Sequence, residues 1–324
     1  MERTCSFRHV SFDQRIEQVG VSTNRGFIVF DCSNGVVLYE AKFPDGGANF
    51  ISILSDSNVV ACSGDDSNGG FMKSTVILWD KKEDKVTRLF DLEMDVIGVV
   101  LHADFLIAAY GDKISFYNAC DFELYCNIKN PTCSLSSFAV VQSISANLVC
   151  YSSEEGDSLN ISDYHDPNYI LATIPFPSAR ISFTQFSRQG EMIAMVTDEG
   201  KTVYLYSLIP KIHLIATYHR GFRIAEVVGL SFDSLCNYFL LTTKRGTLHI
   251  FSIPTPSECQ QITPTNTIRS KIAGDIAKFT EFTCQFDVAG YMITGITKSG
   301  VFKQLRLDVK KSVIVPIQEI DLQV

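Results

Sequence analysis

The sequence predicts an all-β protein, a single-domain, seven-bladed β-propeller of the WD40-like class that spans residues 1–324. Three observations lead to this prediction. One short unit recurs along the chain, strand-like apolar runs precede several of its copies, and no long amphipathic helical pattern separates them.

The recurring unit begins with a turn rich in glycine or polar residues. It continues with alternating apolar and polar residues and usually ends on an aromatic residue. Its seven copies occupy residues 24–31, 74–80, 111–117, 156–161, 199–206, 245–251 and 299–305, the fourth being the weakest. They lie roughly 40 to 50 residues apart, which is the period of four-stranded propeller blades.

Further strands are expected at 59–62, 105–109 and 192–196, where β-rich apolar runs end at turn residues. A propeller uses all of these strands because each blade buries its apolar faces against its neighbours. The N-terminal strand around residues 5–10 is expected to close the ring by pairing into the last blade.

Composition narrows the class of protein. The chain is 46% hydrophobic with a formal net charge of −8, which argues against nucleic acid as its main partner. The first ten residues do not resemble a signal peptide, and the apolar runs are shorter than the roughly 20 residues of a spanning helix. The ten cysteines include no CxxC pair, which favours reduced thiols. We expect a cytoplasmic protein whose membrane contact is peripheral.

Enzyme motifs are missing from the sequence. It contains no phosphate-cradling glycine-rich loop, no HExxH, no GxSxG and no zinc-ligand spacing. Acidic pairs such as Asp65–Asp66 fall in turn-like segments, where we expect solvated loop residues rather than catalytic dyads. The prediction is a protein without enzymatic activity, metal or other cofactor.

The segment between the fifth and sixth copies carries a resemblance to a known family. Residues 218–221, Tyr-His-Arg-Gly, resemble the FRRG signature of the PROPPIN family, the phosphoinositide-binding WD-repeat propellers of autophagy. Residues 240–251 and 193–200 resemble the flanking blades of that family, and residues 76–80 and 113–118 match it in register. The resemblance extends over essentially the whole chain.

This resemblance implies membranes that contain phosphatidylinositol 3-phosphate or the 3,5-bisphosphate as the ligand, bound in two shallow pockets on the propeller rim. It also implies autophagy-type protein partners and peripheral recruitment to endosomal, vacuolar or pre-autophagosomal membranes. A headgroup of this kind requires cations and hydroxyl donors, and arginine matches its phosphate oxygens best. Residues 201–250 carry six Lys and Arg residues against two acidic ones, in a chain with a net charge of −8.

The second pocket of the family has acceptable residues at every position, namely Arg220, Thr243, Thr247 and His249. In a strand, Thr247 and His249 point to the same face because they are two residues apart. That geometry suits joint contact with one ligand.

The first pocket is degraded. His219 replaces the first signature arginine, and Tyr204 and Pro177 replace an arginine and a histidine that the family carries. Losing a bidentate arginine from a charged pocket costs about 2–5 kcal/mol. The residues left for this site are His219, Thr197, Lys201 and, as partial compensation, Arg223.

Family members also insert a loop of the sixth blade into the bilayer, and the matching segment here is 254–274. It has no aromatic anchor, so insertion is expected to be shallow; a disordered connector is the alternative. The candidate membrane-facing residues are Ile262, Ile268, Arg269, Lys271 and Ile272.

Two functions stay open at this point. The first is a lipid-binding adaptor with one competent and one degraded site. The alternative is a propeller scaffold that binds proteins only, favoured by His219 and Tyr204. Headgroup binding would weaken as salt rises, whereas a scaffold would be indifferent to salt.

Overall fold

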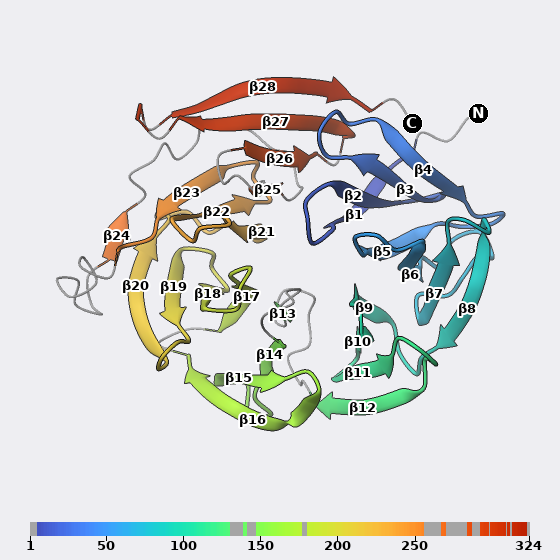
Figure 1. Cartoon of the computed structure of the whole chain (residues 1–324), viewed down its shortest axis with the longest axis horizontal. Coiled ribbons are helices and arrows are strands. Elements are labelled where there is room, and N and C mark those ends of the chain that lie inside the picture. The colour runs from blue at the N-terminus through green and yellow to red at the C-terminus, as the bar shows by residue number, and fades with distance from the viewer. Residues whose placement is uncertain are drawn as a thin grey trace. The chain divides into compact units, whose positions relative to one another are not determined.

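The computed structural model describes residues 5–129, 139–140, 147–176, 180–255, 267–269, 284–286, 292–297, 299–308, 310–311 and 313–322. Every regular element within them is a β-strand (Figure 1). Among these residues there is accordingly no helix of the length and apolarity needed to cross a bilayer. The strands form seven sheets, so the predicted all-β, seven-bladed propeller fold is confirmed.

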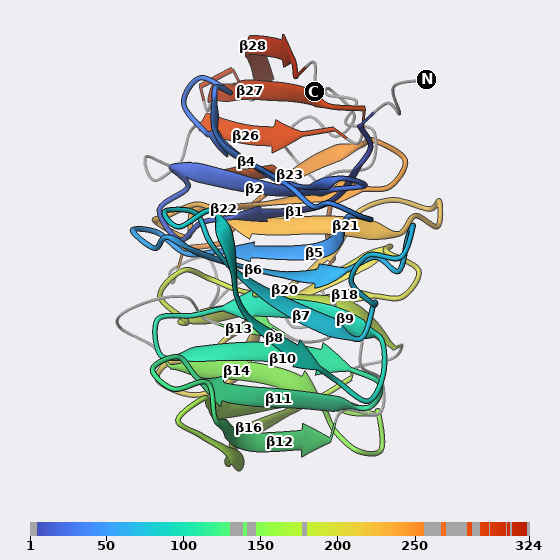
Figure 2. The same ribbon diagram turned by 90° about the vertical axis from the view of Figure 1, so that its right-hand side faces the viewer.

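The chain divides into two compact units. The first comprises Met1–Leu135, Lys298–Gly300 and Asp321–Val324. It contains three four-stranded sheets. Their strands are β1 (Phe7–Phe12), β2 (Gln18–Thr23), β3 (Gly26–Asp31) and β4 (Val37–Lys42); β5 (Ala48–Ile53), β6 (Val59–Gly64), β7 (Thr75–Asp80) and β8 (Lys85–Asp91); and β9 (Val96–Leu101), β10 (Phe105–Tyr110), β11 (Lys113–Asn118) and β12 (Leu124–Lys129). Figure 2 shows β10, β11 and β12 side by side.

The second unit comprises Ser136–Thr297 and Val301–Ile320 and holds the other four sheets. The fourth and fifth blades consist of β13 (Ala139–Val140), β14 (Leu148–Ser152), β15 (Ser158–Asp163) and β16 (Asp166–Pro175), then β17 (Ile181–Phe186), β18 (Met192–Thr197), β19 (Thr202–Ser207) and β20 (His213–His219). The sixth and seventh consist of β21 (Val227–Phe232), β22 (Tyr238–Thr243) and β23 (Leu248–Ser252), then β25 (Cys284–Phe286), β26 (Met292–Ile296), β27 (Val301–Asp308) and β28 (Val313–Asp321). A short strand, β24 (Thr267–Arg269), adds to the outer edge of the fifth blade.

All seven copies of the recurring unit occupy the same place in their sheets. Each provides the third strand, and the set is β3, β7, β11, β15, β19, β23 and β27. The middle strands are buried on both faces, as in β10, whose six residues are all buried. An outer strand such as β8 alternates between exposed and half-buried residues, so only its inner face packs on the blade.

Within each unit, successive blades share apolar cores. In the first unit, Phe27 of β3 packs in one cluster with Ile77 and Trp79 of β7. In the second unit, Val203 of β19 and Phe239 of β22 belong to one cluster, which joins the fifth and sixth blades. The cluster shared by the fifth and sixth blades holds these two blades together, and the candidate site lies at the loop that connects them.

One prediction about the N-terminus is wrong. The strand at its start, β1, pairs with β2 and is the first strand of the first blade, whereas the last blade has four strands of its own from β25 to β28. The reason is that residues 5–23 hold two strands, β1 and β2, ahead of the first repeat copy. They complete the first blade and leave no spare strand for the seventh.

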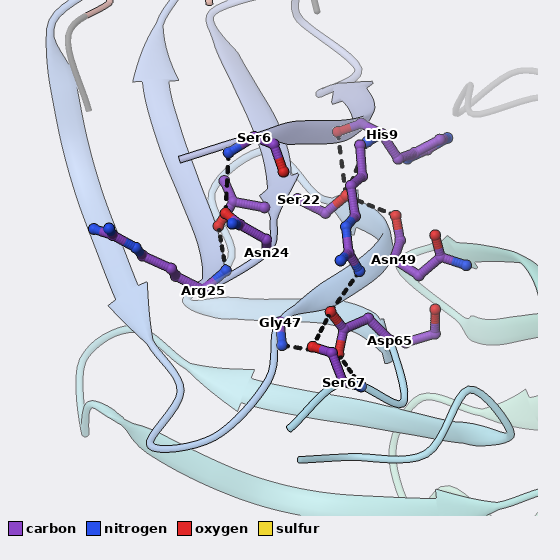
Figure 3. Close-up of polar contacts among 12 residues, drawn as sticks. Ser6, His9, Ser22, Asn24, Arg25, Gly47, Asn49, Asp65 and Ser67 are labelled. Carbon is purple, nitrogen blue, oxygen red and sulfur yellow. Dashed lines mark hydrogen bonds and ion pairs between the residues drawn. The ribbon is translucent and has the colours of Figure 1, made fainter. Parts of the chain in front are cut away.

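A second correction concerns the acidic pair at the end of β6. Asp66 is exposed, but Asp65 is buried and its side chain organises the surrounding turn (Figure 3). Its Oδ1 accepts hydrogen bonds from the backbone N–H groups of Gly47, at 2.9 Å, and Ser67, at 3.0 Å. Its Oδ2 accepts one from Arg8 Nη1 at 2.5 Å and one from the Ser67 hydroxyl at 2.6 Å. Asp65 is therefore a structural residue that ties β1 to the second blade.

The cysteines whose side chains the structure describes, at positions 5, 32, 62, 120, 126, 150 and 236, are free thiols. Burial raises the pKa of Cys150 to about 12 and that of Cys236 to about 11, so both stay protonated at neutral pH. This agrees with the reduced core thiols expected from the sequence.

Candidate functional site

The signature segment leads into a short connecting loop, residues 220–226, between β20 of the fifth blade and β21 of the sixth. Backbone hydrogen bonds fix this loop to the turns on either side of it. The Arg220 N–H donates to the Lys201 carbonyl at 2.8 Å, and the Ala225 N–H donates to the Glu199 carbonyl at 3.2 Å. The Lys244 N–H donates to the Glu226 carbonyl at 2.9 Å. The loop is thus held to the β18–β19 turn and to the β22–β23 turn.

Gly200 makes this close approach possible. Its φ is +62°, a left-handed conformation that costs other residues about 1–2 kcal/mol. A Cβ at this position would lie 1.9 Å from the Ala225 carbonyl oxygen, so no larger residue fits beneath the loop. The glycine of the fifth repeat copy is therefore needed for the shape of the site as well as for the turn.

The Arg220 side chain positions the connecting loop. Its Nε donates to the Gly200 carbonyl at 2.5 Å, and its Nη2 donates to the carbonyl of Arg223. Because both acceptors are backbone groups, the half-buried guanidinium fixes the loop as well as supplying positive charge. A lysine has no planar fork with which to make the same pair of contacts.

On the sixth blade, three predicted residues form a hydrogen-bonded chain. The Thr243 and Thr247 hydroxyl oxygens are 2.7 Å apart, and Nε2 of His249 is 3.2 Å from the Thr247 hydroxyl. Thr243 and His249 are 0% and 5% exposed, whereas Thr247 is half-buried. Thr247 is therefore the accessible member, and the other two lie behind it.

This arrangement refines the expected second pocket. Thr247 and His249 are in contact, as their spacing predicted, but His249 is too deeply buried to share an exposed face with Thr247. The structure brings together Thr243, Thr247 and His249, while the hydrogen bonds of Arg220 point toward the fifth blade and the loop.

Two residues of the first pocket, Thr197 and Lys201, are already engaged within the protein. Thr197 is 5% exposed, and its hydroxyl accepts a hydrogen bond from the Thr202 N–H at 3.3 Å. Lys201 forms an ion pair of 2.5 Å with Glu199. Burial withdraws the Thr197 hydroxyl from a ligand, and the ion pair reduces the effective charge of Lys201, in the pocket that the sequence already marked as degraded.

The two replaced family positions in the described part also lack a fixed cation. Tyr204 is 9% exposed and belongs to the core cluster of the fourth and fifth blades, so it presents no charge to a ligand. The ring of His219 packs edge-on against Phe222, with centroids 5.4 Å apart. Pro177 lies outside the described residues.

Charge at the site is less positive than the sequence count suggested. The loop and its two supporting turns carry five cations and three carboxylates, the latter being Asp198, Glu199 and Glu226. Lys244 pairs with Glu226 at 2.9 Å, much as Lys201 pairs with Glu199. The count over residues 201–250 missed Glu199 because this residue lies just before that window. Arg223 and Arg245 have exposed side chains.

The predicted membrane-facing segment, 254–274, is described only in part. Ile262, Lys271 and Ile272 lie outside the described residues. Ile268 and Arg269 belong to β24, which pairs in parallel with β20 in a register that sets Ile268 opposite Tyr218 and Arg269 opposite His219. This portion of the segment therefore lies beside the signature strand.

Sequence reasoning missed Phe222 as a surface feature of the site. Its side chain is 80% exposed at the centre of the connecting loop. The signal was present, because an aromatic residue follows the signature glycine directly, but exposure in a loop has no periodicity to reveal it.

Comparisons with known proteins agree with the fold. No protein-family model matches the chain. "SVP1-like protein 2" of Schizosaccharomyces pombe is 22% identical over 258 residues, which cover 78% of this chain and 70% of that protein. "Autophagy-related protein 18" of Yarrowia lipolytica is 23% identical over 302 residues, covering 82% and 73%.

Among solved structures, a complex of KlAtg21 with the coiled coil of AgAtg16 contains a chain similar to this one. Its TM-score is 0.82 at 13% sequence identity, and the match covers 98% of this chain and 99% of that one. At this level of identity the likeness to the solved structure shows the shared fold alone.

Proposed function

We propose that this chain, a PROPPIN by its relatives and its fold, is a peripheral membrane adaptor in autophagy or endosomal traffic that binds phosphatidylinositol 3-phosphate or the 3,5-bisphosphate. It has one competent headgroup site and one degraded site. In the competent site Thr247 faces the headgroup, Thr243 and His249 hold Thr247 from behind, and Arg220 adds positive charge.

The hydrogen-bonded chain on the sixth blade is the observation that carries this proposal. Thr247 offers a hydroxyl at the surface, and the 2.7 Å and 3.2 Å contacts to Thr243 and His249 fix its position. A hydroxyl held in this way can donate to a phosphate oxygen with little loss of side-chain freedom. The exposed Arg245, two residues before Thr247, adds a cation to the same turn.

Arg220 contributes in two ways. Its charge attracts the headgroup, and its bonds to the Gly200 and Arg223 carbonyls hold the connecting loop beside the site. The degraded site, with His219, Thr197, Lys201 and Arg223, adds weak electrostatic attraction, because Lys201 is paired with Glu199 and Thr197 is buried.

The adaptor role requires protein partners as well as lipid. The similar solved chain is bound to a coiled coil, which supports autophagy-type coiled-coil proteins as the class of partner for this chain. The candidate surfaces are segments 66–73 and 91–95 at the edges of the second and third blades, whose residues are exposed or half-buried.

The test is co-sedimentation with vesicles that contain phosphatidylinositol 3-phosphate. Thr247→Val keeps the shape of the side chain and removes its hydroxyl, and we expect about a fivefold to tenfold weaker binding. Arg220→Ala should weaken it by at least about 30-fold. Thr87→Val, at an exposed position in β8 of the second blade, is the matched control and should bind normally.

Equal binding by Thr247→Val and Thr87→Val would count against the site. The alternative, a scaffold that binds proteins only, is favoured by the Lys201–Glu199 pair and the buried Tyr204. If the wild-type protein shows no lipid-dependent pelleting at low salt and pH 6, the scaffold is the better description.

A further inference from the structure

Three consecutive side chains in the connecting loop, Phe222, Arg223 and Ile224, are exposed. Phe222 is 80% exposed and Ile224 56%. Isolated apolar residues are common on protein surfaces and need no explanation. Here, however, two large apolar side chains flank an arginine on a loop whose backbone is fixed.

The exposure of Phe222 is a consequence of that fixed backbone. The hydrogen bonds of Arg220 to Gly200 and Arg223 hold the start of the loop, and the Ala225 N–H bond to Glu199 holds its end. Ala225 is buried, which shows that the loop directs one residue inward and its neighbours outward. The Phe222 ring contacts the His219 ring edge-on, and the rest of the Phe222 side chain is exposed to solvent.

The apolar side chains lie at the same end of the sixth blade as the proposed headgroup site. β21 begins at Val227, directly after the loop, and Val227 pairs with Thr243 at the start of the turn that carries Arg245 and Thr247. The opposite end of β21 leads to Leu235, which is also exposed. A six-residue strand spans about 20 Å, so Leu235 faces a different environment from Phe222.

The surrounding charge indicates what covers these side chains. The loop and its two turns carry five cations against three carboxylates, although the whole chain has a net charge of −8. Arg223 stands between Phe222 and Ile224, and Arg245 is exposed in the neighbouring turn. An aromatic and an aliphatic residue interleaved with arginine match the interface of an anionic bilayer, where aromatic rings sit at headgroup level and cations meet lipid phosphates.

We propose that the connecting loop is a membrane anchor in which Phe222 and Ile224 insert into the interfacial layer of an anionic bilayer while Arg223 contacts lipid phosphates. This inference rests on the proposed function, because the anchor would lie beside the bound phosphoinositide headgroup. Segment 254–274 contains no aromatic residue, and in this proposal Phe222 of the connecting loop provides the aromatic anchor instead.

The test separates the membrane from the headgroup. Phe222→Ala should bind vesicles of phosphatidylcholine, phosphatidylserine and phosphatidylinositol 3-phosphate about tenfold more weakly than wild type. Its affinity for soluble inositol 1,3-bisphosphate, measured by calorimetry, should be unchanged. Leu235→Ala is the matched control and should alter neither measurement.

A second variant reports insertion directly. The chain has one tryptophan, Trp79, in the first unit, so Phe222→Trp adds a single new emitter. On vesicles, lipids brominated in the acyl chain should quench the added emission, measured against the wild-type protein. The anchor is overturned if the added emission is not quenched, or if Phe222→Ala binds vesicles as tightly as the wild-type protein does. A loss of binding to another protein by Phe222→Ala would not restore it.

The anchor and the proposed function can fail separately. If soluble headgroup does not bind but Phe222→Ala still weakens binding to phosphatidylserine vesicles, the anchor stands and the phosphoinositide site fails. If the wild-type protein binds the headgroup, Phe222→Ala binds vesicles like wild type and Phe222→Trp shows no quenching, the site stands and the anchor fails. A wild-type protein that binds neither headgroup nor vesicles overturns both.

Discussion

Replacing Asp65 with asparagine removes one charge from the buried contact between β1 and the second blade. The Asp65 side chain is 1% exposed, and its Oδ2 accepts from Arg8 Nη1 at 2.5 Å (Figure 3). Asparagine keeps an acceptor for the N–H groups of Gly47 and Ser67. Its amide nitrogen, however, takes the place of Oδ2 and turns a donor toward the guanidinium.

The expected cost follows from this geometry. Removing one partner of a fully buried ion pair costs about 3–5 kcal/mol. The Arg8 side chain is 28% exposed, so water compensates in part, and we expect about 2–3 kcal/mol here. For a unit of this size that corresponds to a fall in Tm of roughly 5–10 °C.

Thermal unfolding followed by circular dichroism measures this effect. The neighbouring exposed residue gives a matched control, since Asp66→Asn makes the same chemical change on the surface and should leave Tm within about 1 °C. If Asp65→Asn and Asp66→Asn melt together, the buried contact does not stabilise the protein as argued.

The same residue predicts a pH dependence. Burial alone would raise the pKa of Asp65, but hydrogen bonds from Ser67 and Gly47 and the charge of Arg8 outweigh it and leave the pKa below its ordinary value. A depressed carboxyl pKa stabilises the folded state above the unfolded value of 3.8, and this contribution is lost as the pH falls below it. The difference in Tm between wild type and Asp65→Asn should therefore shrink below pH 3.8.

Three further predictions concern other contacts. Arg220→Lys keeps the charge but cannot hold both carbonyls, so we expect vesicle binding nearer to Arg220→Ala than to wild type; wild-type binding would show that charge alone suffices. Gly200→Ala should lower Tm more than Gly69→Ala does. Both glycines have positive φ, but of the two only Gly200 would bring a new Cβ against a backbone oxygen. Equal Tm values for the two variants would exclude this contact. Burial lowers the pKa of His9 to about 4, so the folded state loses about 2–3 kcal/mol between pH 6.5 and 4 as the unfolded chain takes up a proton. His9→Gln should show a smaller fall in Tm over this range, and an unchanged fall would refute it.

The periodic parts of the fold could be predicted from the sequence because burial there follows the period of a strand. Each copy of the recurring unit became the third strand of a blade, and even the weak copy at 156–161 overlaps β15. The position of β1 could not be predicted in the same way. Strand pairing depends on which edge lies nearby, and one apolar run carries no information about its partner.

The candidate site shows the same limit at the level of side chains. Spacing correctly brought Thr247 and His249 together, since residues two apart share a face of the strand. The burial of Asp65 depends on contacts with Arg8 and Gly47, which lie far away in the sequence and which no local pattern encodes. The Lys201–Glu199 pair joins residues only two apart, but its geometry depends on how the β18–β19 turn is folded. The sequence predicts which residues could bind a headgroup, and that stays a prediction; their accessibility depends on packing and could not be predicted from spacing.

The Lys201–Glu199 pair leads to a prediction of tighter binding. Glu199→Gln removes a carboxylate that lies 2.5 Å from Lys201, while the backbone carbonyl that receives the Ala225 N–H remains. The loop should keep its shape, and the released lysine should attract the headgroup with about 1 kcal/mol at contact distance in water, or roughly fivefold. Vesicle binding measured at 50 and 300 mM salt tests this, because the gain should be present at low salt and largely screened at high salt.

Glu155→Gln makes the same change in net charge at an exposed turn of the fourth blade. Equal gains for both variants would mean that net charge controls binding, and the local pair would then have no part in weakening the first pocket.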